Sequence, residues 1–174
     1  MLKKAFVRLS LVGLTMYGMS TPTVMAQDSL FRSDIIGSNP QTIIAGVQSG
    51  GAAWTVERGS AVFNDEGKLR VTLRGLILPS VGSPGPVTSV SASLVCGGTG
   101  GTVVATTDPV PLSADGNADI DAKITVPGPC FAPAVLVRAA AFNGNALPQP
   151  GPWIAGTGFT ALPNSAQHKD GDGN

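Results

Sequence analysis

The chain has 174 residues, of which 43% are hydrophobic and 13% are charged, with 11 basic and 11 acidic residues in formal balance. This length is enough for one domain with a single hydrophobic core. The basic residues do not form a run along the sequence, which argues against nucleic-acid binding, and no stretch rich in Lys and Arg predicts an amphipathic helix for a membrane surface.

The first 26 residues have the three-part pattern of a secretory signal peptide. Lys3, Lys4 and Arg8 form a basic region, an apolar stretch follows over residues 9–19, and a Val-Met-Ala sequence ends at residue 26. The apolar stretch is much shorter than the roughly 20 residues that span a bilayer, so we expect cleavage and no membrane span afterwards. Removing the three basic residues leaves 8 basic against 11 acidic residues in a secreted, periplasmic or cell-surface protein.

The rest of the chain reads as a succession of short strands. Residues 27–41 have mixed composition, and we expect them to be loosely ordered. From residue 42 onward, apolar runs alternate with Gly, Pro, Asn and Asp, as in all-β proteins. The runs that we expect to form strands are 42–47, 53–63, 68–78, 87–96, 102–108, 118–126, 132–142 and 153–159.

The clearest of these strands is 68–78. In it, Leu69, Val71 and Leu73 alternate with charged or hydroxyl side chains, which predicts one buried face and one face in water. About eight strands without intervening helices predict antiparallel pairing and fit an immunoglobulin-like two-sheet sandwich over residues 42–162. An antiparallel barrel is the alternative. The polar residues 163–174 are predicted to form a flexible tail.

The sequence contains two cysteines, Cys96 and Cys130. In an exported protein an even number of cysteines indicates a disulfide, and two residues allow one pairing. Closing a loop of roughly 35 residues would stabilise the fold by about 3–4 kcal/mol in the chain-entropy model. A metal site is the competing interpretation, but the sequence offers no further ligands beside these thiols.

The most suggestive motif is SADGNADIDAKITV, residues 113–126. Asp115, Asn117 and Asp119 have the spacing of the first three ligands of an EF-hand, but the later positions that demand Gly and Glu hold Ile and Val. These three residues remain candidates for an irregular surface calcium site. Asp119 and Asp121 share one strand face and are candidates for the paired carboxylates of a glycosidase. We predict instead a turn followed by a strand whose polar side faces water, with no cofactor.

Trp54 and Trp153 are candidate ligand platforms. An exposed Trp on a sheet would offer a flat, amphipathic surface to a sugar. Each Trp begins an apolar strand, however, and this position favours burial in the core near the disulfide.

Four further segments lie within about residues 45–160: GGAAWTVERGSAVFNDEGKLRVTLRGLIL, VSASLVCGG, VVATTDPVPLSADGNADIDAKITVPGPCFAPAVLVRAA and WIAGTGF. Together they resemble small secreted bacterial proteins of uncharacterised function. The resemblance implies a bacterial origin and one disulfide-bearing β-sandwich domain. It implies no activity and no site residues.

Two functions from different classes fit these observations. The favoured one is an exported non-enzymatic β-sandwich that serves as an envelope, matrix or interaction module. Its partner is unknown, and an envelope component, a glycan and another protein are the candidates. The alternative is a carbohydrate-binding domain, or a weak glycan hydrolase, that uses Trp54 or Trp153 with Asp115, Asp119 or Asp121.

Overall fold

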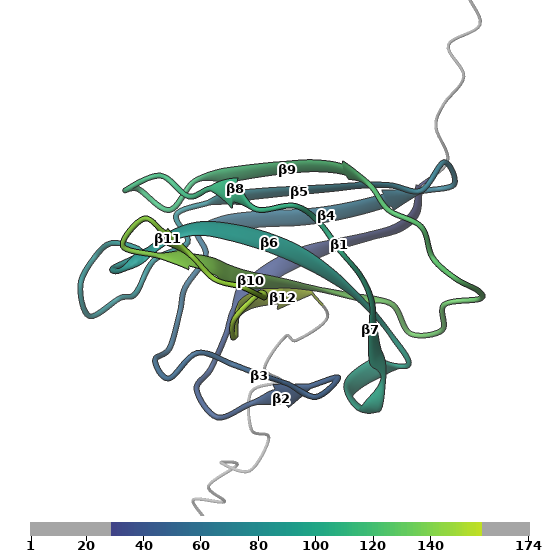
Figure 1. Ribbon diagram of the computed structural model, residues 1–174, viewed down its shortest axis with the longest axis horizontal. Coiled ribbons are helices and arrows are strands. Elements are labelled where there is room, and N and C mark those ends of the chain that lie inside the picture. The colour runs from purple at the N-terminus through teal and green to yellow at the C-terminus, as the bar shows by residue number, and fades with distance from the viewer. Residues whose placement is uncertain (1–28, 158–174) are drawn as a thin grey trace, which may run out of the picture.

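The structure is a computed structural model that describes residues 29–157 (Figure 1). The predicted signal peptide, the last residues of the predicted domain and the predicted tail lie outside the described residues. Within them, antiparallel strands dominate, and helical structure is limited to a single 3-10 turn, η1 (Gly98–Gly100). The all-β prediction is confirmed. Residues 29–157 contain no helix that could serve as a membrane span.

Twelve strands form in the described residues, and four of them are only two residues long. In chain order they are β1 (Ser29–Gly37), β2 (Ile43–Ile44), β3 (Val47–Gln48), β4 (Arg58–Asn64), β5 (Lys68–Arg74), β6 (Val87–Cys96), β7 (Thr102–Thr106), β8 (Val110–Pro111), β9 (Ala118–Lys123), β10 (Ala134–Phe142), β11 (Asn145–Ala146) and β12 (Trp153–Thr157). Ten strands form one sheet with the path β7-β6-β10-β12-β1-β4-β5-β9, to which β8 adds on β6 and β11 on β10. The hairpin β2–β3 is separate.

Strand β1 connects the two halves of this sheet. Its first part, from Ser29 to Asp34, pairs with β4, and its last three residues pair with β12. The sheet curls, so that Val71 of β5 and Ile120 of β9 pack in one core cluster with Val90 of β6 and Val135 of β10. Figure 1 shows β9, β5 and β4 lying over β6 and β10. The curled sheet therefore surrounds a single main core.

The expectation of loose order over residues 27–41 is wrong for residues 29–37, which form β1. Phe31, Ser33 and Ile35 alternate with more exposed neighbours, as in a half-buried strand. The polar Ser33 at an inward position hides this pattern in the sequence. At the end of the strand, a Cβ on Gly37 would lie 1.9 Å from the Trp54 carbonyl oxygen, so the strand requires glycine there.

A second apolar cluster lies on the opposite face of β6, β10 and β12. There the hairpin β2–β3 covers the sheet, and Ile44, Val95, Leu136 and Trp153 are buried together. The indole Nε1 of Trp153 donates a hydrogen bond to the carbonyl oxygen of Thr42 at 3.3 Å. This half of the sheet is consequently buried on both faces.

The predicted disulfide is confirmed. Cys96, the last residue of β6, is bonded to Cys130 in the loop before β10, and their Cα atoms are 5.1 Å apart. Beside the bond, the Gly97 amide donates to the Phe131 carbonyl at 2.7 Å. A disulfide of this kind is typical of proteins that fold in an oxidising compartment.

Candidate functional site

Both tryptophans are buried in the structure. Trp54 is 7% exposed and packs in the main core, and Trp153 is 3% exposed beneath the hairpin β2–β3. Neither ring presents a face to solvent, so the candidate platforms for a ligand are not formed. The position of each Trp at the start of an apolar run was the signal that favoured burial.

The segment around Asp115 is a tight turn, as predicted. Gly116 has φ +75°, and a Cβ there would lie 2.3 Å from the Leu76 carbonyl oxygen. The Asn117 Oδ1 accepts a hydrogen bond from the Gly75 amide at 3.1 Å, and the Asn117 amide donates to the Ser113 hydroxyl at 3.0 Å. Asn117 thus connects the turn to the end of β5, and its side-chain oxygen is already used in this contact.

Asp119 and Asp121 lie on the exposed side of β9, also as predicted. The Arg74 Nη2 lies 3.0 Å from both carboxylate oxygens of Asp119. Asp121 lies 3.2 Å from the Lys68 ammonium and 3.1 Å from the Arg70 guanidinium. Within residues 29–157, no three His, Cys, Asp or Glu side chains are grouped so that they could hold a metal ion.

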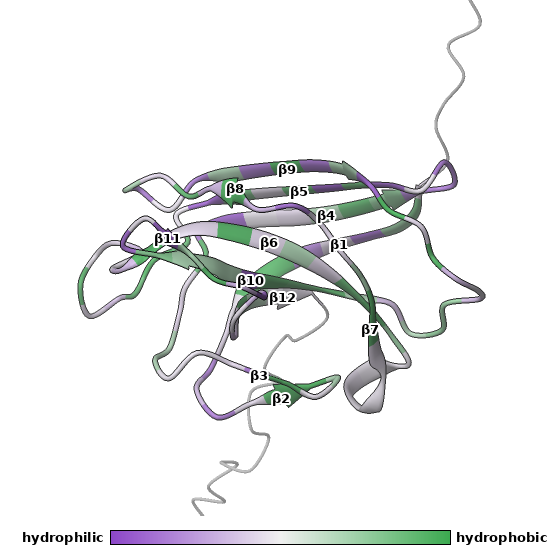
Figure 2. Cartoon of the chain, in the orientation of Figure 1, coloured by the Kyte–Doolittle hydropathy of each residue, from purple (hydrophilic) through white to green (hydrophobic). Residues whose placement is uncertain are grey.

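These two carboxylates belong to a larger polar surface, the outward face of β1, β4, β5 and β9. We call it the charged face. It consists of Arg32, Asp34, Arg58, Ser60, Val62, Lys68, Arg70, Thr72, Arg74, Asp119, Asp121 and Lys123. Of the seven basic residues between 29 and 157, six lie on this face. Figure 2 shows the hydrophilic stretches along β9, β5 and β1 that contribute to it.

The strand register arranges the centre of the charged face in rows. Asp34, Ser60, Thr72 and Asp119 are successive cross-strand partners on β1, β4, β5 and β9. Neighbouring strands are about 4.8 Å apart, so this row crosses roughly 14 Å of the sheet. It consists of two hydroxyl groups between two carboxylates.

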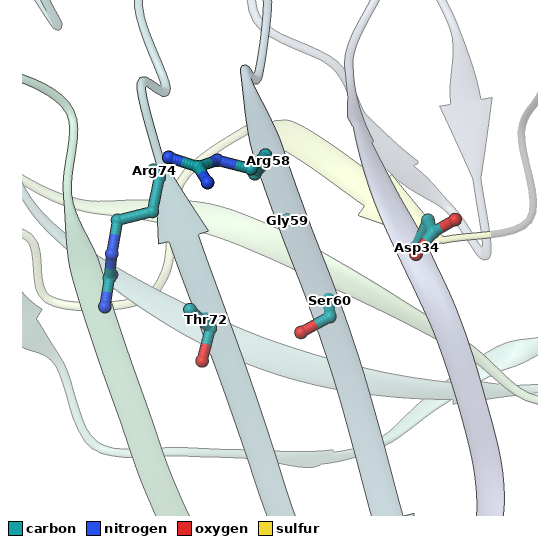
Figure 3. Close-up of a pocket in the computed structure, with 6 residues that line it drawn as sticks. All are labelled: Asp34, Arg58, Gly59, Ser60, Thr72 and Arg74. Atoms are coloured by element: carbon teal, nitrogen blue, oxygen red, sulfur yellow. The ribbon is translucent and has the colours of Figure 1, made fainter.

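A shallow depression, which we call the polar trough, lies along part of this row. It is lined by Asp34, Arg58, Gly59, Ser60, Thr72 and Arg74. Figure 3 shows the Arg58 side chain extending from β4 toward β5, the Arg74 side chain extending away from Ser60, and Asp34 standing on β1 at the other side.

Like charges face each other at both ends of β5. Arg58 is the direct cross-strand partner of Arg74, and Lys68 is the partner of Lys123. Like charges placed directly opposite on neighbouring strands destabilise a sheet. A fold under selection for stability alone would avoid such pairs, and departures of this kind concentrate at functional sites.

Carboxylates offset only part of this repulsion. Hydrogen bonds from Lys68 and Arg70 lower the pKa of Asp121, so its carboxylate stays ionised between the two cations. Arg74 is held by Asp119 and also donates from Nη1 to the carbonyl oxygens of Leu73 and Ala118. Among its twelve residues the charged face has six basic side chains against three carboxylates, and two further acids lie at its edge, Glu57 beside Arg58 and Glu66 beside Lys68 and Lys123.

No family model, curated protein or solved structure matches this chain. The charged face is therefore the feature of the molecule that points to a function.

Sequence reasoning found the parts of this face but not the whole. The alternation in β5 and β9 identified Lys68, Arg70, Asp119 and Asp121 as residues in water. It could not show that β5 lies between β4 and β9, because strand order is set by long-range pairing. The signal that was available is the polar alternation in Arg32 and Asp34, which continues the same face on β1.

A second depression of different character lies near the disulfide. It has a volume of about 250 Å³ and a mainly apolar lining of Leu30, Phe31, Phe63, Leu94, Val126, Gly128, Cys130 and Pro133. No charged side chain lines it, so it lacks the groups that would orient a polar ligand.

Proposed function

We propose that the protein is an exported, non-enzymatic interaction module that binds an anionic component of the cell envelope or extracellular matrix through its charged face. The observation that carries this proposal is the gathering of six of the seven basic residues between 29 and 157 on one face of the sheet. A surface with a net positive charge attracts anionic partners and accelerates their association.

Export and fold class are parts of the same proposal. The disulfide between Cys96 and Cys130 supports an oxidising compartment, and the basic and apolar start of the sequence supports export through a signal peptide. The position of β4, β5 and β9 over β6 and β10, around one core, supports a two-layer, immunoglobulin-like sandwich. The residues quoted above as similar to secreted bacterial proteins support a bacterial origin.

The electrostatics of β9 favour binding over catalysis. A glycosidase needs one carboxyl group with a raised pKa to act as a general acid. The cations beside Asp121 lower its pKa, and Asp119 is paired with Arg74. Because Asp121 has a lowered pKa and Asp119 is already paired with Arg74, these groups fit an electrostatic binding surface better than an acid–base pair.

The test is cosedimentation of the mature protein with isolated envelope and matrix fractions. A triple variant, Arg32→Gln with Arg58→Gln and Lys123→Gln, removes three exposed charges from the charged face. A control of opposite sign, Asp65→Asn with Asp108→Asn and Asp115→Asn, removes three exposed negative charges elsewhere. We expect the triple variant to lose at least tenfold in salt-sensitive binding and the control to bind as well as the wild type. Equal binding by the triple variant and the wild type would overturn the proposal.

A further inference from the structure

Resting on that proposed function, we infer that the polar trough is a binding site for an acidic polysaccharide. In this site Arg58 pairs with the carboxylate of a uronic acid, and Ser60, Thr72 and Asp34 form hydrogen bonds with sugar hydroxyl groups. The inference follows from which polar groups in the trough are already used by the protein and which remain available.

Arg58 is the available cation of the trough. Its side chain is 78% exposed, and its Nη2 lies 3.7 Å from the Glu57 carboxylate, whose side chain is 70% exposed. This distance is too long for a hydrogen bond, so the guanidinium keeps its donors for a ligand. A guanidinium binds a carboxylate through two parallel hydrogen bonds, which fixes the position of the anion as well as attracting it.

Arg74 has a different part in the trough. Its guanidinium is held by Asp119 and by the carbonyl oxygens of Leu73 and Ala118, so its donors are already used. Its position opposite Arg58 on the neighbouring strand costs stability through the like-charge pair on β4 and β5. An anion bound by Arg58 would relieve that repulsion.

The oxygen atoms of the polar trough supply hydrogen-bonding groups for the uncharged part of the ligand. In residues 29–157, the Asp34 carboxylate and the hydroxyl groups of Ser60 and Thr72 make no side-chain hydrogen bond. A carboxylate accepts hydrogen bonds, whereas a hydroxyl group both donates and accepts them. A ligand that satisfies these groups must present hydroxyl groups beside its anionic group, as a polyuronate does.

Nucleic acid fits the same surface less well. Single-stranded nucleic acids are held by aromatic side chains on which the bases stack, and the twelve residues of the charged face include no aromatic residue. A closely spaced phosphate chain along the central row would also lie against Asp34 and Asp119. A DNA strand has few hydroxyl groups to donate to these carboxylates, whereas each sugar of a polyuronate carries hydroxyl groups that can donate hydrogen bonds to them.

Isothermal titration calorimetry of the mature protein tests the inference, with polygalacturonate, neutral dextran, dextran sulfate and single-stranded DNA as probes. We expect the wild type to bind polygalacturonate most tightly and dextran not at all. Arg58→Gln should weaken polygalacturonate binding at least tenfold, since it removes a charged hydrogen-bond donor. Arg58→Lys keeps the charge but loses the paired geometry, and it should fall between the wild type and Arg58→Gln.

Deleting one hydroxyl group distinguishes specific binding in the polar trough from general electrostatic attraction. Thr72→Val removes one hydroxyl group at constant shape, and we expect about three- to tenfold weaker polygalacturonate binding with unchanged binding of dextran sulfate. Thr125→Val is the matched control, because Thr125 is exposed outside the charged face. It should bind polygalacturonate like the wild type. Unchanged thermal unfolding of each variant confirms that the fold is intact.

Three results would overturn the inference. If dextran sulfate or DNA binds as tightly as polygalacturonate, the face attracts polyanions in general, and the proposed function survives without this specificity. If polygalacturonate binds to the wild type, Arg58→Gln and Thr72→Val with equal affinity, the polysaccharide site lies elsewhere. If no anionic polymer binds and the triple variant still cosediments with envelope fractions, the inference and the proposed function both fail.

Discussion

The two halves of the curled sheet differ in how many of their faces are buried. In β5 and β9, buried residues alternate with partly or fully exposed ones, so these strands have one face in the core and one in water. β12 is buried throughout, and β10 is buried at all but two positions, because the hairpin β2–β3 covers its second face. The same backbone architecture therefore supports two different roles.

This difference shows where function can be located. The covered half places apolar side chains on both faces and is committed to stability. The open half buries one row of side chains and leaves the other row to interact with a partner. The like-charge pairs Arg58–Arg74 and Lys68–Lys123 occur only in the open half, where solvent reduces their cost.

The largest expected loss of stability comes from a substitution in the covered half. Trp153→Ala removes a fully packed indole beneath the hairpin and should lower the free energy of unfolding by about 3–5 kcal/mol. Val62→Ala on the charged face truncates a partly exposed side chain and should cost under about 1 kcal/mol. Urea unfolding of both variants measures the difference. Equal losses would contradict the division between the halves.

The disulfide ties the end of β6 to the loop before β10, in the covered half. Replacing both cysteines by serine should lower the free energy of unfolding by about 3–4 kcal/mol, because the unfolded chain regains the entropy of a 34-residue separation. Thermal unfolding of the double variant, compared with the oxidised and reduced wild type, measures this loss. A double variant as stable as the oxidised wild type would contradict the prediction.

A glycine in the open half is expected to have a smaller effect. Gly116→Ala introduces a Cβ at φ +75° and within 2.3 Å of the Leu76 carbonyl oxygen. Backbone strain of this kind costs about 1–3 kcal/mol. Denaturant unfolding of this variant should show such a loss, whereas Gly144→Ala, also at positive φ but with no atom within 4 Å, should lose less. Similar losses would show that dihedral strain dominates over the close contact.

Single ion pairs on the charged face should contribute least to stability. Asp119→Asn weakens one exposed pair with Arg74 and should change the free energy of unfolding by less than about 1 kcal/mol. The change should shrink further in 1 M salt, where the Debye length is about 3 Å. Unfolding at low and high salt measures both effects. A large, salt-independent loss would show that Asp119 has a structural role that its exposure does not indicate.

Asp121 gives the charged face a pH dependence. Hydrogen bonds from Lys68 and Arg70 lower its pKa in the folded protein below the unfolded value of 3.8. The stabilisation is therefore present above that value and is lost as the pH falls through the folded pKa. Melting temperatures measured from pH 6 to pH 2 should fall less steeply for Asp121→Asn than for the wild type. Parallel curves would contradict this assignment.

The sequence predicts the open half better than the covered half. Alternation identifies a strand when one face meets water, and the residues of β5 and β9 follow this rule closely. It also predicts the turn at Asp115 and the pairing of the two cysteines. The first is local, because the turn needs a positive φ that glycine adopts without strain, and the second has one solution, because two cysteines allow one bond.

Long-range pairing explains what the sequence could not predict. Residues 29–37 have an irregular apolar pattern, and the strands that they pair with, β4 and β12, lie far from them in the sequence. The polar trough depends on the register that aligns Ser60 of β4 with Thr72 of β5 and Asp34 of β1. No local sequence pattern indicates which residues of these strands pair. The basic residues therefore look scattered along the chain although they share one face.

Nuclear magnetic resonance offers the most direct test of the charged face as a binding surface. Amide chemical shifts of isotopically labelled protein, produced from residue 27 onward, would be followed as polygalacturonate is added. The account predicts shifts in β1, β4, β5 and β9, largest around Arg58, Ser60 and Thr72, with the amides of β2, β3 and β12 unchanged. Shifts that instead cluster around Trp153 or the depression beside the disulfide would contradict it.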